Sequence, residues 1–303
     1  MSVLTLHHPV YFLENQQLFP ANTIINEETL DALISSSKKT FYQKYSLLKH
    51  GTVKEDLYKL ISSTPYNLIF TDRKQITNIL DIMGRVNYVL PVLQSLDYFK
   101  IHDFYTYRHI LIVFALSTLL AEDLISNHDE RIMGTMAGPL HDIGKICVPL
   151  HVLTKSDPLN QTELSVLQHH SVAGYILLCY YLRETQNISA IVARDHHERR
   201  DGSGYPQGIL QNNLITDIVI VSDIYDALIS PRPYRRNAYD NRTALEEITK
   251  MAESNKIDWA VVKALLSHNR KENPHYSDCI VSTEKRGTPP PDNVYGVIVD
   301  KEE

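Results

Sequence analysis

One stretch of the chain concentrates side chains that could do chemistry: residues 196–206 read HHERRDGSGYP. The adjacent imidazoles of His196 and His197 run directly into a turn that contains two glycines and ends in Tyr-Pro. Imidazole is the commonest metal ligand in proteins, so the pair is a candidate half of a metal centre. The glycines relax the steric limits on the backbone and let it approach a ligand closely.

Further candidate ligands interrupt apolar stretches elsewhere in the chain. His109 has helical spacing to Val113 and Leu116, on a face where an unpaired imidazole is costly to bury. Asp223 closely follows the apolar run 218–221, where a bare carboxylate is strongly disfavoured. The candidate ligands are His109, His141, Asp142, His170, His196, His197 and Asp223.

These side chains divide into two groups that share one carboxylate. The first group is His109, His141, Asp142 and Asp223; the second is His170, His196 and His197, with Asp142 as the bridge. All donors are nitrogen or oxygen, which favours iron or manganese, with zinc also compatible, and disfavours the oxygen-preferring Mg²⁺. Two neighbouring ions can share a hydroxide and clamp both oxygens of an in-line phosphoryl displacement.

Mostly helical elements must position these ligands. Between residues 100 and 270 the apolar spacing predicts helices over 103–124, 130–143, 162–183, 188–197, 214–229, 243–254 and 259–268. Residues 1–48 read as a small α/β module, with short strands at 9–13, 24–25 and 40–42 and a helix that begins after the N-cap Asn26. Residues 53–98 have helical stripes, for which core packing is the default interpretation and a connecting or dimerising helical unit is the alternative. The polar, proline-rich end after 271 is expected to be mobile or laid over the surface.

Composition narrows the function classes. The net charge of −6 and the pI near 6.2 argue against binding long nucleic acids through a basic face. The three cysteines form no CxxC pair, which argues against a disulfide framework or a thiolate zinc site and suits a reducing cytoplasm. The most apolar run, 110–121, is shorter than the roughly 20 residues that span a bilayer, so we expect a buried helix and no membrane contact.

The order H…HD…H…HH…D resembles the HD superfamily of metal-dependent phosphohydrolases. Three blocks resemble its HD-GYP family: HDIGK at 141–145, HHERRDGSGYP at 196–206, and DIYDAL at 223–228 with RPYR at 232–235. The resemblance implies a mainly α, HD-type helical bundle with the small N-terminal α/β module as an accessory. It divides the chain into an accessory region (1–98), a catalytic domain (99–270) and a polar tail (271–303).

The resemblance also implies roles. The seven candidate ligands match the family's metal ligands, and Asp142 and Lys145 are its catalytic pair. Lys145, Tyr205, Arg232 and Arg235 match substrate-binding residues. The planar fork of an arginine suits phosphate.

One position departs from the family pattern. Members with three metal ions carry a glutamate four residues before the first histidine, where this chain has Tyr105. A phenol is a poor ligand at neutral pH, and Asp103 would point elsewhere on a regular helix. Two divalent ions per chain are therefore expected. Among the neighbours, Asp226 either lies behind the ligands or is a helix cap. Glu198 and Asp201 are expected to stabilise the loop or to orient a ligand rather than to act as general acids.

The implied activity is hydrolysis of cyclic di-GMP to pGpG, GMP or both by a hydroxide that two metal ions activate. One alternative is a non-catalytic sensor or docking module for cyclic dinucleotides; two others are a cyclic GMP-AMP phosphodiesterase and an HD phosphohydrolase acting on linear nucleotides. The implied partners are the cyclic dinucleotide and a GGDEF-type or other signalling protein that docks on the GYP loop. A homodimer is compatible with the sequence.

Overall fold

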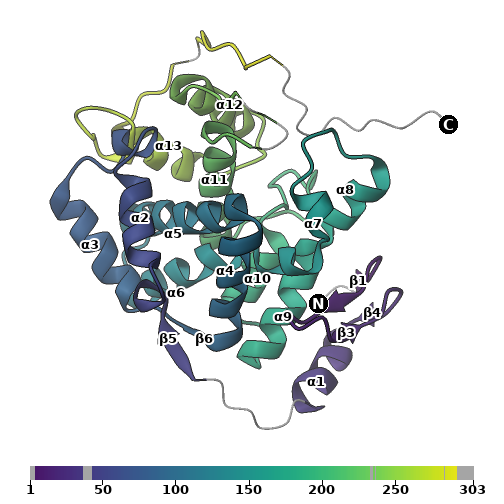
Figure 1. Ribbon diagram of the computed structural model, residues 1–303. Helices are drawn as coiled ribbons and strands as arrows, with labels where there is room; N and C mark the ends of the chain where they lie inside the picture. The colour runs from purple at the N-terminus through teal and green to yellow at the C-terminus, as the bar shows by residue number, and fades with distance from the viewer. Residues whose placement is uncertain (1–3, 37–42, 233–234, 236, 283, 292–303) are drawn as a thin grey trace.

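The computed structural model describes residues 4–36, 43–232, 235, 237–282 and 284–291. Helices dominate it, as predicted, and α5 (Phe104–Leu124) runs through the middle of the bundle (Figure 1). The other helices of the bundle are α2 (Val53–Ile61), α3 (Arg73–Gly84), α4 (Leu90–His102), α6 (His128–Ala137), α9 (His170–Leu182), α10 (Ile188–Asp195), α11 (Leu214–Ile229), α12 (Asn241–Glu253) and α13 (Trp259–His268), of which α2, α3, α4, α6, α11 and α13 pack directly on α5. Shorter helices are α7 (Leu150–Leu153) and α8 (Gln161–Gln168).

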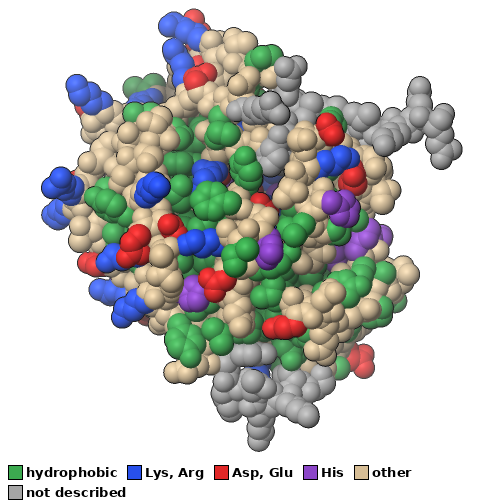
Figure 2. Space-filling model, viewed as in Figure 1, with side chains coloured by type: hydrophobic (Ala, Val, Ile, Leu, Met, Phe, Trp, Pro, Cys, Tyr) green, Lys and Arg blue, Asp and Glu red, His purple; other side chains and the backbone are tan. Residues whose placement is uncertain are grey.

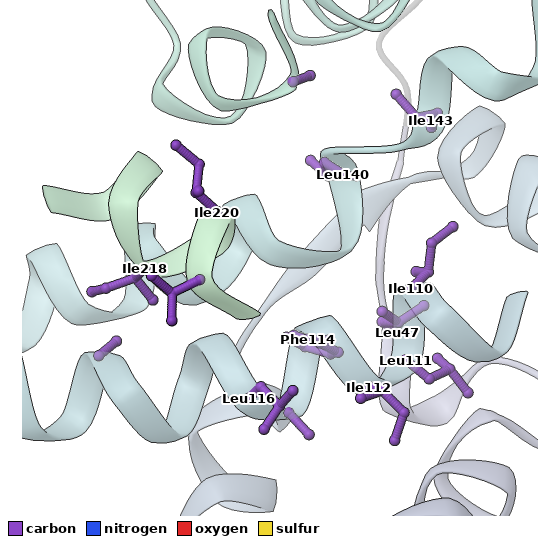
Figure 3. Close-up of a cluster of buried hydrophobic side chains, with 14 of the residues drawn as sticks. Leu47, Ile110, Leu111, Ile112, Phe114, Leu116, Leu140, Ile143, Ile218 and Ile220 are labelled. Carbon is purple, nitrogen blue, oxygen red and sulfur yellow. The ribbon is translucent and has the colours of Figure 1, made fainter. Parts of the chain in front are cut away.

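From residue 109 to residue 121, helix α5 is buried on every side, which is why this stretch is almost entirely apolar. Its apolar 18-residue window is long and hydrophobic enough to cross a membrane, yet 83% of that window is buried inside the protein. Helix α11 packs on α5, and Phe114, Leu116, Ile218 and Ile220 of these two helices belong to one cluster of buried apolar side chains (Figure 3). The expected buried helix at 110–121 is confirmed.

Two predicted helix boundaries differ from the structure. The helix expected over 130–143 ends at Ala137, and a 3₁₀ turn follows at Gly138–Leu140, because Pro139 has no N–H to continue the helical ladder. The helix expected over 162–183 is two helices, α8 and α9, with His169 between them. The N–H of His169 still reaches the Ser165 carbonyl at 3.1 Å, so this boundary is a bend.

The N-terminal α/β module is confirmed. Strands β1 (Leu4–Thr5) and β4 (Ile24–Ile25) pair antiparallel, as do β2 (Val10–Tyr11) and β3 (Gln17–Phe19), and α1 (Glu27–Ser36) follows. Asn26 caps α1 by accepting the N–H of Thr29 at 2.8 Å. The strand predicted at 40–42 lies outside the described residues. Figure 1 shows this module beside α9.

Residues 44–102 join the central core. Strands β5 (Lys44–Ser46) and β6 (Asn87–Val89), which the sequence did not predict, pair with each other, and α2, α3 and α4 each pack on α5. The predicted division at residue 98 falls within α4. The division into an accessory region and a catalytic domain at this residue stays a prediction.

The described part of the C-terminal tail lies over the surface. The backbone N–H groups of Arg286 and Gly287 donate to Glu246 of α12, at 2.9 and 2.7 Å. Cys279 is buried against the bundle. On the face drawn in Figure 2, the described Lys and Arg side chains are scattered among acidic and apolar ones, and they form no continuous basic patch.

Candidate metal centre

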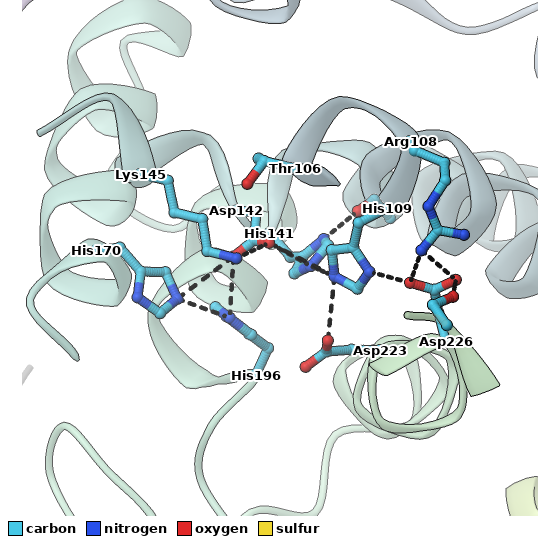
Figure 4. A network of polar contacts seen from close by, with 12 residues as sticks. Thr106, Arg108, His109, His141, Asp142, Lys145, His170, His196, Asp223 and Asp226 are labelled. Carbon is cyan, nitrogen blue, oxygen red and sulfur yellow. Dashed lines mark hydrogen bonds and ion pairs between the residues drawn. The ribbon is translucent and has the colours of Figure 1, made fainter. Parts of the chain in front are cut away.

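Five separate segments bring the seven predicted ligands together at the centre of the bundle (Figure 4). Helix α5 supplies His109, and the turn between two 3₁₀ segments supplies His141 and Asp142. Helix α9 begins with His170, His196 and His197 follow α10, and α11 carries Asp223.

The first group consists of His109, His141 and Asp223. The Nε2 atom of His109 lies 3.2 Å from Nε2 of His141 and 3.1 Å from Oδ1 of Asp223. The two imidazoles are buried, and the Asp223 side chain is 15% exposed. Ligand atoms this close can converge on a single ion.

The second group consists of His170, His196 and His197. The Nε2 atom of His170 lies 3.2 Å from Nε2 of His196 and 3.1 Å from Nε2 of His197. His170, and not its neighbour His169, enters the group. The His169 ring packs instead against His8 of the N-terminal module, with ring centroids 5.6 Å apart.

Asp142 stands between the two groups. Its Oδ2 atom lies 3.5 Å from Nε2 of His109 and 3.4 Å from Nε2 of His141. Its Oδ1 atom lies 3.4 Å from Nε2 of His170 and 3.9 Å from Nε2 of His196. Each oxygen therefore faces one group, which is the arrangement expected of a bridging carboxylate.

The outer nitrogens of four imidazoles set their tautomers. Nδ1 of His141 lies 2.7 Å from the Gly138 carbonyl, and Nδ1 of His170 lies 2.6 Å from the Leu167 carbonyl. Carbonyl oxygens only accept, so each Nδ1 carries the hydrogen and each Nε2 presents a bare lone pair. Nδ1 of His196 and of His109 face the Ala193 carbonyl and the Asp226 carboxylate, at 2.9 and 2.6 Å.

The lone pairs of the Nε2 atoms point toward one another, and this arrangement fits a bound metal ion. Facing Nε2 atoms 3.1–3.2 Å apart repel unless a proton or a cation lies between them. Metal-ligating histidines characteristically donate their other N–H to a carbonyl or a carboxylate, as these do. The donor set of imidazoles and carboxylates fits divalent iron, manganese or zinc.

The protonation states also suit metal binding. Burial lowers the pKa of His170 to about 4 and holds the pKa values of His196 and His197 well below their usual range. Neutral imidazole is the form that binds a metal. Burial opposes protonation of His141, but the charge of Asp142 outweighs it and raises the His141 pKa. A bound cation would replace that proton.

Two close backbone approaches require glycine. Gly144, two residues after Asp142, packs against the backbone of His170 and Gly174, where a Cβ atom would clash. Gly204 lies against the backbone of His197 and Glu198, so the loop can fold back over the histidines. Both glycines thereby bring distant ligands together.

The predicted substrate-binding residues lie in different surroundings. Lys145 Nζ is 2.6 Å from Oδ2 of Asp142. Burial raises the pKa of Asp142, but the positive charge of Lys145 and of the neighbouring histidines outweighs it and holds this pKa well below its usual range. The Tyr205 ring stacks on His197, with centroids 4.5 Å apart and planes at 19°. Arg232 Nη2 lies 3.2 Å from Nδ1 of His109. These three residues line the histidine groups.

Arg235 is placed differently from the prediction. Its side chain is buried, and its Nη2 donates to the carbonyls of Leu228 and Ser230, at 3.0 and 3.1 Å, and also to that of Ala227. Its guanidinium packs over the Tyr239 ring. The orphan carbonyls at the end of a helix attract such a donor, so in this structure Arg235 closes α11 instead of facing the histidine groups.

Asp226 lies behind the first group. Its Oδ2 accepts from His109, and Arg108 and Arg232 lie 3.2 and 3.5 Å from that oxygen. The sequence left a helix cap open as an alternative, which the buried contact with His109 excludes. Sequence reasoning missed Arg108 and its partner Tyr66; the position of Arg108 beside His109 was the available signal.

The remaining neighbours behave as predicted. Glu198 accepts the backbone N–H groups of Gln207, Gly208 and Ile209 at 2.7–3.2 Å, and thus stabilises the loop. Asp201 accepts from Ser203.

At the start of α5, Asp103 is the N-cap, and its carboxylate accepts the N–H of Thr106 at 3.3 Å and the hydroxyl of Thr106 at 2.6 Å. Tyr105 is 41% exposed.

Comparison with known proteins points to one family. The sequence model of the HD domain family matches residues 58–261, more than half of the chain. The cyclic di-GMP phosphodiesterase response regulator RpfG of Xanthomonas campestris pv. campestris is 42% identical over 119 residues, which cover 39% of this chain and 32% of that protein.

Two further relatives extend the comparison. A cyclic di-GMP phosphodiesterase of Thermotoga maritima is 35% identical over 168 residues, covering 55% of this chain and 44% of that protein. The 3'3'-cGAMP-specific phosphodiesterase 1 of Vibrio cholerae is 35% identical over 134 residues, covering 43% of this chain and 30% of that protein. The chain spans less than half the length of each of these three relatives.

Proposed function

Because this chain belongs to the HD domain family and, by its motifs, to the HD-GYP group within it, we propose that it hydrolyses cyclic di-GMP. The products are pGpG and, after a second cut, GMP. The observation that carries the proposal is the pair of ligand groups that share Asp142, one oxygen facing each group. A cytoplasmic location agrees with the three free cysteines.

Two divalent ions, iron or manganese with zinc also compatible, would be held by His109, His141 and Asp223 and by His170, His196 and His197. When bound, such a pair supplies a hydroxide nucleophile and positive charge for the phosphate oxygens. The buried Nδ1–H contacts hold the imidazoles in one orientation. Asp142, with one oxygen facing each group, would contribute a ligand to both ions.

The other side chains hold the substrate. The ammonium of Lys145 stands beside Asp142, where it neutralises a non-bridging phosphate oxygen. The Arg232 guanidinium, on the other side of His109, binds a phosphate oxygen or a base edge. The stacked ring of Tyr205 closes the His197 side and contacts the nucleotide. Arg235 acts indirectly, by holding the segment that carries Arg232.

Two alternatives follow from particular observations. The similarity to a relative named for 3'3'-cGAMP makes cyclic GMP-AMP a second candidate substrate, since neither purine is recognised by a residue identified in this site. A non-catalytic sensor is the other alternative, and it would bind a cyclic dinucleotide without cutting it. The intact ligand set and Lys145 favour catalysis. Docking of a GGDEF-type partner on the loop 196–206, and a homodimer, remain proposals.

One experiment tests the activity. The protein is purified without added metal, its metal content is measured, and turnover of cyclic di-GMP, cyclic GMP-AMP, a cyclic mononucleotide and a linear nucleotide is followed by chromatography. We expect about two ions per chain and fastest turnover of cyclic di-GMP; chelator-treated protein is the control. Binding without turnover would favour the sensor, and faster turnover of the linear nucleotide would favour a general HD phosphohydrolase.

A further inference from the structure

Tyr66, far from the motifs in sequence, reaches the back of the metal centre. It lies in a 3₁₀ turn, Tyr66–Leu68, between α2 and α3, and its side chain is buried. The hydroxyl donates to Oδ1 of Asp226, 160 residues further along the chain, and lies 2.6 Å from Oγ of Ser230. Burial raises the pKa of Tyr66, so the phenol keeps its proton and remains a donor.

Arg108 completes a directed chain of hydrogen bonds. Its Nη1 donates to the Tyr66 oxygen at 2.9 Å, and its Nη2 lies 3.2 Å from Oδ2 of Asp226. Arginine has no acceptor and a carboxylate has no donor, so the direction runs from Arg108 through Tyr66 to Asp226. The Asp226 side chain is fully buried, so each contact is costly to lose.

Asp226 passes this constraint to the first ligand group. Its Oδ2 accepts the Nδ1–H of His109 at 2.6 Å, on the side opposite the Nε2 atom that faces His141 and Asp223. The carboxylate thus fixes both the tautomer and the ring orientation of His109. The hydroxyl of Tyr66 holds the other oxygen of the same carboxylate, which limits its rotation.

We propose that Tyr66 is a positioning residue for the metal site of His109, His141 and Asp223, and that it acts through Asp226. The inference rests on the proposed function, in that it requires this group to hold an ion. Without the hydroxyl, Oδ1 of Asp226 keeps the donation from Ser230 Oγ at 3.0 Å but loses that from Tyr66. The carboxylate then turns more easily toward Arg108 and Arg232, and its hydrogen bond with His109 weakens. The affinity of the first group for metal then falls, whereas the second group keeps its own anchors.

The second group gives the internal reference. His170 and His196 donate to the carbonyls of Leu167 and Ala193, which belong to the backbone of their own segments. No described contact links Tyr66 to these histidines. A local role for Tyr66 therefore predicts a change at one ion only.

The test compares two buried tyrosines that lose the same atom. In Tyr66→Phe the contact with Asp226 disappears. In the control Tyr225→Phe, a hydroxyl on α11 that contacts Asn241 and Asn269, at 2.6 and 3.2 Å, disappears instead. Metal-free protein is titrated with Mn²⁺ against a chromophoric chelator, and thermal unfolding of the metal-free proteins is recorded beside it.

We expect wild type to bind two Mn²⁺ ions and Tyr66→Phe to bind one of them about tenfold more weakly, at the lower end of the effect of losing an outer-shell partner. Tyr225→Phe should match wild type at both ions. In an Asp226→Asn background, Tyr66→Phe should add little, because the two residues act in series. Additive effects of the two changes would overturn the assignment.

The remaining outcomes separate the two proposals. If Tyr66→Phe bound both ions as tightly as wild type does, the inference would be overturned and the proposed function would stand. If Tyr66→Phe bound both ions more weakly to the same degree and also unfolded at a lower temperature than Tyr225→Phe, Tyr66 would have a general structural role, which would also overturn the inference. A wild type that binds no metal would instead refute the proposed function.

Discussion

His109 of the first ligand group is anchored differently from His141 in the same group and from His170 and His196 in the second, whose Nδ1 atoms face backbone carbonyls. The Nδ1 atom of His109 faces Asp226, 117 residues away in the chain, and Asp226 is flanked by the neighbouring Arg108 and by Arg232 from the segment after α11. Among the described residues, the Nδ1 atoms of His170 and His196 face backbone carbonyls of the preceding helical turn. The orientation of His109 therefore depends on side chains far away in the chain, whereas that of His141, His170 and His196 follows from local backbone geometry.

The second group depends on side chains in another way. His197 belongs to the loop that folds back over the histidines, and this loop is anchored by Glu198 and by Arg200. Arg200 lies 2.9 Å from Asp217 of α11 and 2.5 Å from Asp258 at the start of α13. Here side chains hold the loop, and the loop positions His197 and Tyr205.

The largest effect should come from the residue that both groups share. Asp142→Ala removes the carboxylate between them, so we expect loss of both ions and a fall in turnover of about a thousandfold or more. Metal analysis and chromatographic assay measure the two effects. Asp129→Ala, at an exposed position in the first turn of α6, is the control. Undiminished hydrolysis by Asp142→Ala would contradict the two-ion mechanism.

Removal of one ligand from one group should separate the groups. Asp223→Ala weakens the first group and His197→Ala the second, so each variant should retain about one ion per chain and lose about a hundredfold or more in turnover. Metal analysis after gel filtration gives the stoichiometry. If either change emptied both sites, the two groups would be one cooperative unit.

The loop anchor should affect substrate handling more than metal content. Glu198→Gln replaces a carboxylate that accepts three backbone N–H groups with an amide that has one acceptor oxygen. We expect an unfolding free energy about 1.5–3 kcal/mol lower and a higher KM, because Tyr205 loses its fixed position. Urea unfolding and steady-state kinetics measure these. A proportional loss of metal would show that Glu198 acts on the ligands themselves.

The last prediction concerns the pH dependence of stability at the Arg200 anchor, with no expected change in metal binding or turnover. Burial, with the neighbouring charge of Asp258, raises the pKa of Asp217 to about 6 against the opposing effect of Arg200. The folded state thus holds this proton more tightly than the unfolded state, whose pKa is about 3.9. The resulting contribution to stability is complete below about pH 4 and is lost as the pH rises through 6.

Asp217→Asn should remove this dependence. Between pH 4 and 7, the unfolding free energy of metal-free wild type should fall relative to the variant by up to about 3 kcal/mol. Urea unfolding at several pH values tests it. Parallel pH profiles would mean that Arg200 holds Asp217 ionised throughout.

Local features were readable from the sequence. The apolar spacing predicted α11 at 214–229 and α13 at 259–268 with the bounds that the structure has. Asn26 was recognised as a cap because capping involves only neighbouring residues. Imidazoles and carboxylates set in apolar stretches marked candidate ligands because burying them unpaired is costly.

Only the tertiary structure decided how these side chains meet. The two oxygens of Asp142 face different groups because α5, α9 and α10 pack around one turn. Arg235 donates to carbonyls at the end of α11, and this contact depends on the path of the chain after that helix. Tyr66 reaches Asp226 across 160 residues, a contact without any periodic or motif signal in the sequence. Sequence patterns report local backbone geometry and burial, whereas contacts between remote elements arise from packing.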